Sequence, residues 1–116
     1  MAYVDGFVLA VPKQKVEEYK ALATTAGKVW MEYGAKAYVE CAGDDTPYGK
    51  LTSFPRAVLA TDDEIVFFSW IVYDSKEARD AINAKVMADP RLHEHTDHPF
   101  DGKRMIFGGF VPVVQF

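Results

Sequence analysis

Several residue types are scarce in this chain of 116 residues, and each scarcity excludes a class of protein. Cys41 is the only cysteine, so neither an intrachain disulfide nor a four-cysteine zinc site can form. No apolar run reaches the ~18 residues of a membrane span, and the N-terminus reads as a strand, not as a signal peptide. Basic residues number 13 against 17 acidic ones, which argues against a nucleic-acid-binding surface. We therefore expect a soluble cytoplasmic protein without membrane or nucleic-acid partners.

Apolar residues are plentiful by contrast, at 49% of the chain, and aromatic residues reach 14%, which is enough for a folded core. Apolar patterns of strand type predict four strands, at residues 3–11, 35–42, 64–73 and 104–114. Apolar residues at helical spacing predict two helices, at 13–33 and 74–89, with Asp74 capping the second. The long connection between the second and third strands predicts a short helix or a packed loop at 53–58.

The order strand, helix, strand, strand, helix, strand is that of the ferredoxin-like βαββαβ fold, an α+β fold with a four-stranded antiparallel sheet. We expect residues 1–116 to form one such domain. Two helices cover one face of a sheet, yet the strand at 64–73 is apolar on both faces. Exposing a Val, Ile or Phe side chain there forfeits about 1.5–3 kcal/mol. We therefore expect a second copy to cover the other face, giving a homodimer built as an α/β barrel.

Six short segments, spread over nearly the whole chain, resemble the YbaA-like family of bacterial proteins, domain of unknown function 1428. They are Tyr3-Val4-Asp5-Gly6-Phe7, Val29 to Glu32, Tyr38-Val39-Glu40-Cys41, Phe68-Ser69-Trp70-Ile71, Met87 to Arg91 and Pro99 to Met105. The resemblance implies a dimeric α/β barrel, in a superfamily that also holds cofactor-free quinol monooxygenases and haem-binding chlorite dismutases. It implies no activity, because the family has no established one.

Polar side chains on the predicted strands are the candidates for a ligand site. Asp5 or Glu40, if desolvated in the dimer interior, would have a raised pKa and could accept a proton from a phenol-like or enol substrate. The alternative is that each carboxylate pairs with Arg or Lys or accepts backbone hydrogen bonds. The further pocket candidates are Tyr38, Ser69, Trp70, Tyr73 and Arg104. A slip of one residue would move all of these strand positions to the opposite face.

Three histidines, His93, His95 and His98, lie within six residues and beside acidic side chains. Imidazole and carboxylate groups bind first-row metals, but the segment is a loop without evident second-shell support, so the competing interpretation is a solvated loop. Histidines in a polar loop also do not favour haem. We therefore expect no cofactor and no metal, and we interpret Cys41 as a buried structural residue.

Three functions remain open from the sequence. The first is a small dimeric protein that binds an apolar or aromatic metabolite, as the two-sided apolar strands with few polar tips suggest. The second is a cofactor-independent oxygenase or isomerase that acts on a quinol- or enol-like substrate with Asp5 or Glu40 as its base. The third is a structural or regulatory dimer with a solid interior and no ligand. A cavity in the structure would favour the first two.

Overall fold

The computed structural model of the chain describes residues 1–93 and 98–116. Four strands form one antiparallel sheet in the order β2-β3-β1-β4. Their bounds are Tyr3–Pro12 for β1, Ala37–Ala42 for β2, Glu64–Tyr73 for β3 and Ile106–Phe110 for β4. This strand order and the intervening helices confirm the ferredoxin-like α+β fold.

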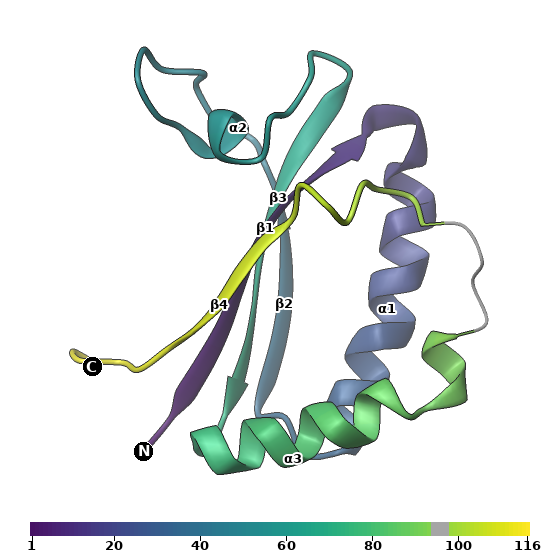
Figure 1. Ribbon diagram of the computed structural model, residues 1–116, viewed down its shortest axis with the longest axis vertical. Coiled ribbons are helices and arrows are strands. Elements are labelled where there is room, and N and C mark those ends of the chain that lie inside the picture. The colour runs from purple at the N-terminus through teal and green to yellow at the C-terminus, as the bar shows by residue number, and fades with distance from the viewer. Residues whose placement is uncertain (94–97) are drawn as a thin grey trace.

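Within residues 1–93 and 98–116, three helices and two short 3-10 turns connect the strands (Figure 1). The long helix α1 and helix α3 lie on one side of the sheet, and the short helix α2 lies on the other side. Their bounds are Lys13–Lys15 for η1, Val16–Glu32 for α1, Phe54–Ala57 for α2, Lys76–Met87 for α3 and Pro90–Leu92 for η2. The predicted short helix near residues 53–58 is therefore present as α2.

The ends of the helices follow local chemistry. Gly34 follows α1 with a φ of 114°, a left-handed conformation that glycine adopts without a steric penalty. The predicted cap of α3 is wrong by one residue. Ser75, not Asp74, accepts the hydrogen bond from the backbone of Ala78, at 3.0 Å. Ser75 is extended, which is the backbone conformation that a capping residue needs.

The covered face of the sheet is the one beneath α1 and α3, and it holds two clusters of buried residues. Leu9, Val11 and Phe67 pack against Tyr19 and Ala23 of α1. A second cluster joins the sheet to α3 and to the end of α1 through Val29, Ala35, Ile71, Tyr73, Ile82 and Val86. Side chains alternate along a strand, so every second residue of β1 and β3 faces these helices.

The open face is the opposite side of the sheet, and helix α2 covers only one end of it. There Val58 packs on Val8, Ala10 and Val66. Beyond this contact the face is apolar but exposed, since Phe68, Ile106 and Phe110 keep 43%, 46% and 63% of their surface accessible. The sequence-based expectation that the helices leave one apolar face uncovered is thus met within the described residues.

Strand β4 is shorter than the predicted strand at 104–114. It pairs with β1 over only five residues, from Ile106 opposite Val8 to Phe110 opposite Val4. The side chain of Arg104, which the pattern placed inside the strand, instead bonds to Asp101 and Glu64. Since Glu64 begins β3, these ion pairs tie the segment before β4 to the end of that strand through side chains and not through ladder bonds.

Candidate functional site

Glu40 lies on the edge strand β2, on the covered face of the sheet. It stands directly across from the buried Ser69 of β3, and Tyr38 projects to the same side because it lies two residues earlier. Helix α1 passes over this part of the sheet and places Tyr19 opposite Glu40. Three sheet residues predicted for the site, Tyr38, Glu40 and Ser69, are therefore brought together. They meet under α1, on the covered face and not on the open one.

Each oxygen of the Glu40 carboxylate accepts one phenolic hydrogen bond. Tyr19 donates to Oε1 at 2.8 Å, and Tyr38 donates to Oε2 at 3.0 Å. Partial burial raises the pKa of Glu40, while the hydrogen bonds from Tyr19, Tyr38 and Ser69 oppose that rise. Burial and the nearby carboxylate raise the pKa of both tyrosines, which therefore stay protonated and remain donors.

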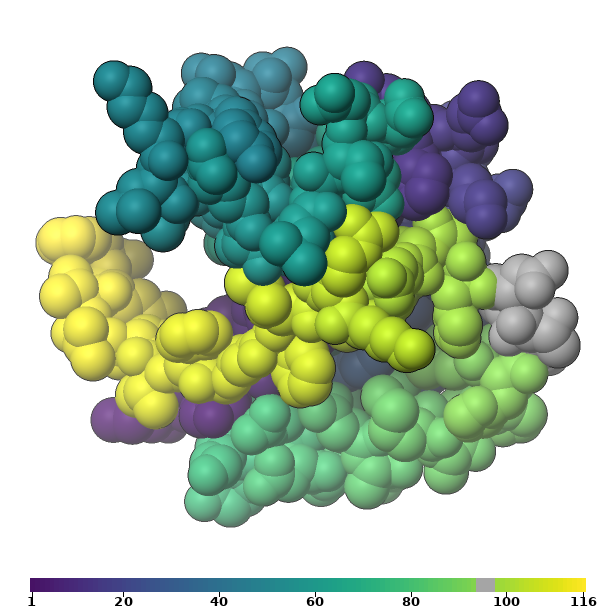
Figure 2. Space-filling model, turned by 45° about the horizontal axis from the view of Figure 1, so that its top comes forward, coloured from purple at the N-terminus to yellow at the C-terminus, as the bar shows by residue number. Residues whose placement is uncertain are grey.

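A cavity of about 190 Å³ lies between α1 and the sheet, with the Glu40 carboxylate in its wall. We call it the inner cavity. Its walls are mainly aromatic and aliphatic, and Ser69 and the Glu40 cluster supply the polar groups. The lining residues are Phe7, Leu9, Tyr19, Leu22, Ala23, Ala26, Trp30, Tyr38, Glu40, Ser69, Trp70, Ile71, Phe100 and Met105. The surface is hollowed between the segment leading into β4 and helix α3 (Figure 2).

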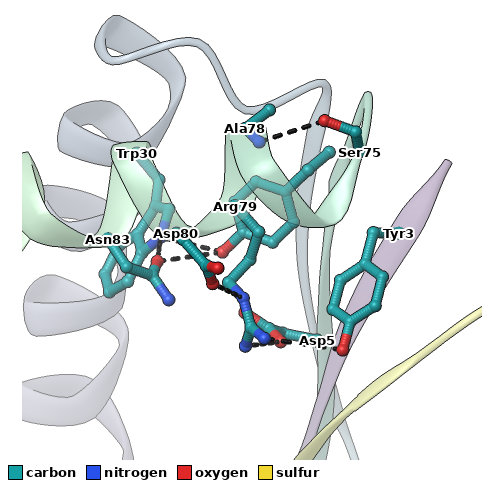
Figure 3. Close-up of polar contacts among 9 residues, drawn as sticks. Tyr3, Asp5, Trp30, Ser75, Ala78, Arg79, Asp80 and Asn83 are labelled. Atoms are coloured by element: carbon teal, nitrogen blue, oxygen red, sulfur yellow. Dashed lines mark hydrogen bonds and ion pairs between the residues drawn. The ribbon is translucent and has the colours of Figure 1, made fainter. Parts of the chain in front are cut away.

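Asp5 occupies a different place on the covered face, near the start of β1 and beneath α3 (Figure 3). It is 5% exposed, and Arg79 of α3 donates to its Oδ1 at 2.9 Å. The same guanidinium lies over the ring of Tyr3, 4.9 Å from its centroid, and contacts Asp80 at 2.8 Å. Asp5 is thus a paired carboxylate outside the lining of the inner cavity.

Tyr73, another predicted site residue, is completely buried next to this ion pair. Burial, foremost, and the charge of Asp5 raise the pKa of its phenol. Trp30 donates to the Tyr73 hydroxyl and to Asn83 Oδ1, both at 3.1 Å, and the Tyr73 hydroxyl donates to Asn83 at 3.2 Å (Figure 3). This network fixes the indole of Trp30, which lines the inner cavity. Tyr73 therefore stabilises the cavity wall through Trp30.

Arg104 and Trp70 also lie away from the Glu40 cluster. Arg104 makes two bonds to Glu64, at 2.6 and 2.8 Å, and one to the Leu59 carbonyl. Chiefly because of the bonds from Arg104, the pKa of Glu64 falls to about 2. Trp70 is among the residues that line the inner cavity, but its ring lies on the open face, where it contacts Phe68 with centroids 5.6 Å apart.

His93 and His98, the histidines within the described residues, contact other parts of the chain. His93 contacts the Met87 carbonyl through Nε2 at 2.7 Å, and the ring of His98 packs against Phe100. His95 lies outside the described residues. Within the described part of the chain, no three His, Cys, Asp or Glu side chains are placed to share a metal ion.

The sequence interpretation did not name Tyr19 as a site residue, although Tyr19 belongs to the stripe of apolar residues at helical spacing that predicts the helix at 13–33. That stripe alternates bulky residues with small ones, since Ala23 and Ala26 follow Tyr19 and precede Trp30. Small residues between large ones leave space beneath a helix. This spacing was the signal in the sequence for a cavity under α1.

No helix in the described residues combines the length and the apolar character needed to cross a membrane. Residues 2–102 match the model of a family described as "Protein of unknown function (DUF1428)". The uncharacterized protein YbaA of Escherichia coli (strain K12) is 52% identical over 116 residues, which cover 99% of each chain.

Solved structures share the fold at much lower identity. Rv0793 from Mycobacterium tuberculosis has a TM-score of 0.61 at 11% identity, covering 99% of this chain and 98% of the other. An uncharacterized NIPSNAP domain protein from Burkholderia xenovorans has a TM-score of 0.55 at 17% identity, with 96% and 94% covered. SnoaB from Streptomyces nogalater, described as a cofactor-independent oxygenase, has a TM-score of 0.55 at 12% identity, with 98% and 93% covered. At these identities the likeness extends to the fold alone.

Proposed function

Because this chain belongs to the DUF1428 family, whose description names no activity, its function has to be sought in the site itself, and we propose that it binds a small single-ring molecule carrying a hydrogen-bond donor. The observation that supports this proposal best is the inner cavity, whose wall is mainly apolar and carries the carboxylate of Glu40 among a few polar groups. Ligand sites in proteins combine these two properties, an apolar pocket and a few placed polar groups.

The size of the cavity limits the ligand. An apolar cavity of about 150 Å³ is large enough to hold benzene. At about 190 Å³, the inner cavity has room for one ring with a small substituent. Aromatic side chains such as Phe7, Trp30 and Phe100 supply ring surfaces for stacked or edge contacts.

The polar group decides the chemistry of the ligand. Glu40 already accepts one phenolic hydrogen bond at each oxygen and a bond from Ser69, and its two oxygens together offer about four lone-pair sites, so one site remains for a further donor. A phenol or enol hydroxyl in the inner cavity can therefore donate to Glu40, whereas a hydrocarbon of the same shape cannot. The proposal thus favours phenol-like or enol-like ligands over plain aromatic ones.

Calorimetric titration with phenol and with toluene tests this proposal. We expect phenol to be preferred, and the ratio of the two affinities to fall about tenfold in Glu40→Gln, which corresponds to roughly 1.4 kcal/mol. Glu77→Gln, an exposed change on α3, is the matched control and should leave the ratio unchanged. A folded protein that binds neither probe would contradict the proposal and favour a dimer without a ligand.

A second candidate function is a cofactor-independent oxygenase acting on a quinol-like substrate. The observation in its favour is that partial burial raises the pKa of Glu40, as a general base working near neutral pH requires. SnoaB, which shares the fold, is described as a cofactor-independent oxygenase. Oxygen uptake with hydroquinone, present in the native protein and lost in Glu40→Gln, would support this function over simple binding.

We also propose that the open face is covered by a second copy of this chain. A trough of about 670 Å³ runs along it, lined by apolar residues of β1, β3 and β4 and by Val111 and Pro112. An exposed apolar surface of this kind, extending over three strands, is typical of an interaction site. Sheet-to-sheet contact between two copies would bury it and produce the expected α/β barrel.

Two substitutions on adjacent residues of β3 test this dimer. Phe68 faces the open side and Phe67 is 3% exposed in the core, so Phe68→Asp should give a folded monomer and Phe67→Asp should fail to fold. Met87→Asp is the control, since Met87 is 56% exposed at the end of α3. Light scattering that shows a dimer for Phe68→Asp, or a monomer for the native protein, would contradict the dimer.

The proposed location is the cytoplasm. A chain with the single cysteine Cys41 has no intrachain disulfide for which an oxidising compartment would be needed. Cell fractionation with an antibody against the native protein tests this location.

A further inference from the structure

A second hollow lies on the other side of the Glu40 cluster, between α1 and the edge strand β2. We call this hollow, of about 600 Å³, the outer groove. It shares four lining residues with the inner cavity, namely Tyr19, Ala23, Tyr38 and Glu40. Exposed side chains of α1, including Thr24 and Lys28, form its outer part. The inner cavity and the outer groove are therefore neighbours with a common wall.

Tyr38 supplies one of the two tyrosine rings of that wall, and its ring lies directly against the backbone of α1. A Cβ atom placed on Gly27 would come within 2.9 Å of Tyr38 Cδ1 and 3.1 Å of Cε1. Side chains do not approach so closely, and hence the ring can take this position only because residue 27 is glycine. Glycine within a helix costs about 1 kcal/mol of helix stability relative to alanine. At position 27 this cost accompanies the close packing of the Tyr38 ring on the helix.

Two more contacts hold the same ring in place. The Tyr38 hydroxyl donates to Glu40, and the ring packs against Trp30 with centroids 6.0 Å apart. Trp30 is in turn fixed by Tyr73 and Asn83. The Tyr38 ring is thus held between the backbone of α1 and Trp30, and its hydroxyl is held by Glu40, so the side chain forms a fixed wall.

We infer that Tyr38 determines the size of the ligand, by closing the inner cavity toward the outer groove. This inference rests on the proposed binding function and adds an upper limit on the size of the ligand. With Tyr38 in place, the site accepts one ring whose donor reaches Glu40. Without the ring of Tyr38, the inner cavity continues into the outer groove. A substituent next to the ligand hydroxyl can then extend into that groove.

Phenol and 2-phenylphenol are the probes for this inference, because the second ring of 2-phenylphenol is adjacent to the hydroxyl that reaches Glu40. We expect the native protein to bind 2-phenylphenol at least tenfold more weakly than phenol. Tyr38→Ala should raise the affinity for 2-phenylphenol at least tenfold. Tyr38→Phe is the matched control, since it removes the bond to Glu40 but keeps the ring, and it should still exclude the larger probe.

Circular dichroism establishes that each variant is folded, and Tyr38→Leu replaces Tyr38→Ala if the smaller side chain prevents folding. Exclusion of 2-phenylphenol by a folded Tyr38→Ala or Tyr38→Leu protein overturns the inference. So does equal binding of both probes by the native protein or by Tyr38→Phe. Absence of phenol binding in the native protein is a separate result, because it removes the proposed function itself.

Discussion

Asp5 and Glu40 lie on the same face of the same sheet, yet the structure surrounds them differently. Asp5 is buried against the guanidinium of Arg79, a cation that compensates its charge. Glu40 is less buried, but its partners are the neutral phenols of Tyr19 and Tyr38. A guanidinium satisfies a carboxylate as an ion, whereas two phenols solvate it without neutralising it.

The difference shows why one carboxylate is structural and the other is a candidate for chemistry. The Arg79 guanidinium compensates the charge of Asp5 and bonds to its Oδ1, so this carboxylate serves to join β1 to α3. Burial without a cation moves the pKa of Glu40 upward, toward the range in which a carboxyl group can gain and lose a proton. Only Glu40 also lines a cavity that can hold a ligand.

The largest expected effect comes from removing the cation beside Asp5. Arg79→Leu leaves a buried carboxylate unpaired, and we expect a loss of about 3 kcal/mol in the free energy of unfolding. Urea denaturation measures it, and Asp5→Asn in the same background should restore part of the loss. Lys20→Leu breaks only the exposed pair with Glu17 and should cost at most about 1 kcal/mol. Equal effects of the two changes would remove the distinction drawn here for Asp5.

A smaller effect is expected from removing one phenol beside Glu40. Tyr19→Phe deletes the bond to Oε1 and should cost about 1.5 kcal/mol, the usual lower value for a hydrogen bond to a charged group. Because that bond lowers the pKa of Glu40, the substitution should also raise this pKa further. Carbon-13 NMR of the Glu40 carboxyl during a pH titration measures the shift, and a fall in pKa would contradict it.

The smallest expected effect is a pH dependence of stability. The pKa of Glu40 is higher in the folded protein than in the unfolded chain, so the folded state binds the proton more tightly. This contribution to stability is complete below the unfolded pKa and is lost as the pH rises through the folded one. Relative to Glu40→Gln, the native protein should therefore lose stability from acid toward neutral pH. Denaturation curves at several pH values would show the opposite slope if a neighbouring cation held the pKa of Glu40 below its ordinary value.

Local patterns in the sequence were sufficient to predict most of the fold. The predicted strand at 64–73 has the bounds of β3, since its two-sided apolar run ends at charged residues. The fourth strand was predicted too long, because the apolar residues at 111–114 resemble a strand but do not pair with β1. A strand forms only where a partner strand is available to pair with it. The local pattern at 104–114 does not show how many of its residues have such a partner in β1.

The site was predictable only in part for the same reason. Alternation along β2 places Tyr38 and Glu40 on one face, and the sequence shows this directly. The groups that distinguish the two carboxylates come from far away: Arg79 is 74 residues from Asp5, and Tyr19 is 21 residues from Glu40. Which helix docks over which part of the sheet decides these partners.

Helix α1 covers both the inner cavity and the outer groove, because its residues Tyr19 and Ala23 line both spaces. A movement that lifts α1 from the sheet therefore opens both spaces in one event. The rate at which a trapped molecule escapes would then follow the opening rate of this helix. Hydrogen exchange at the amides of α1 and the residence time of a bound phenol would report the same motion.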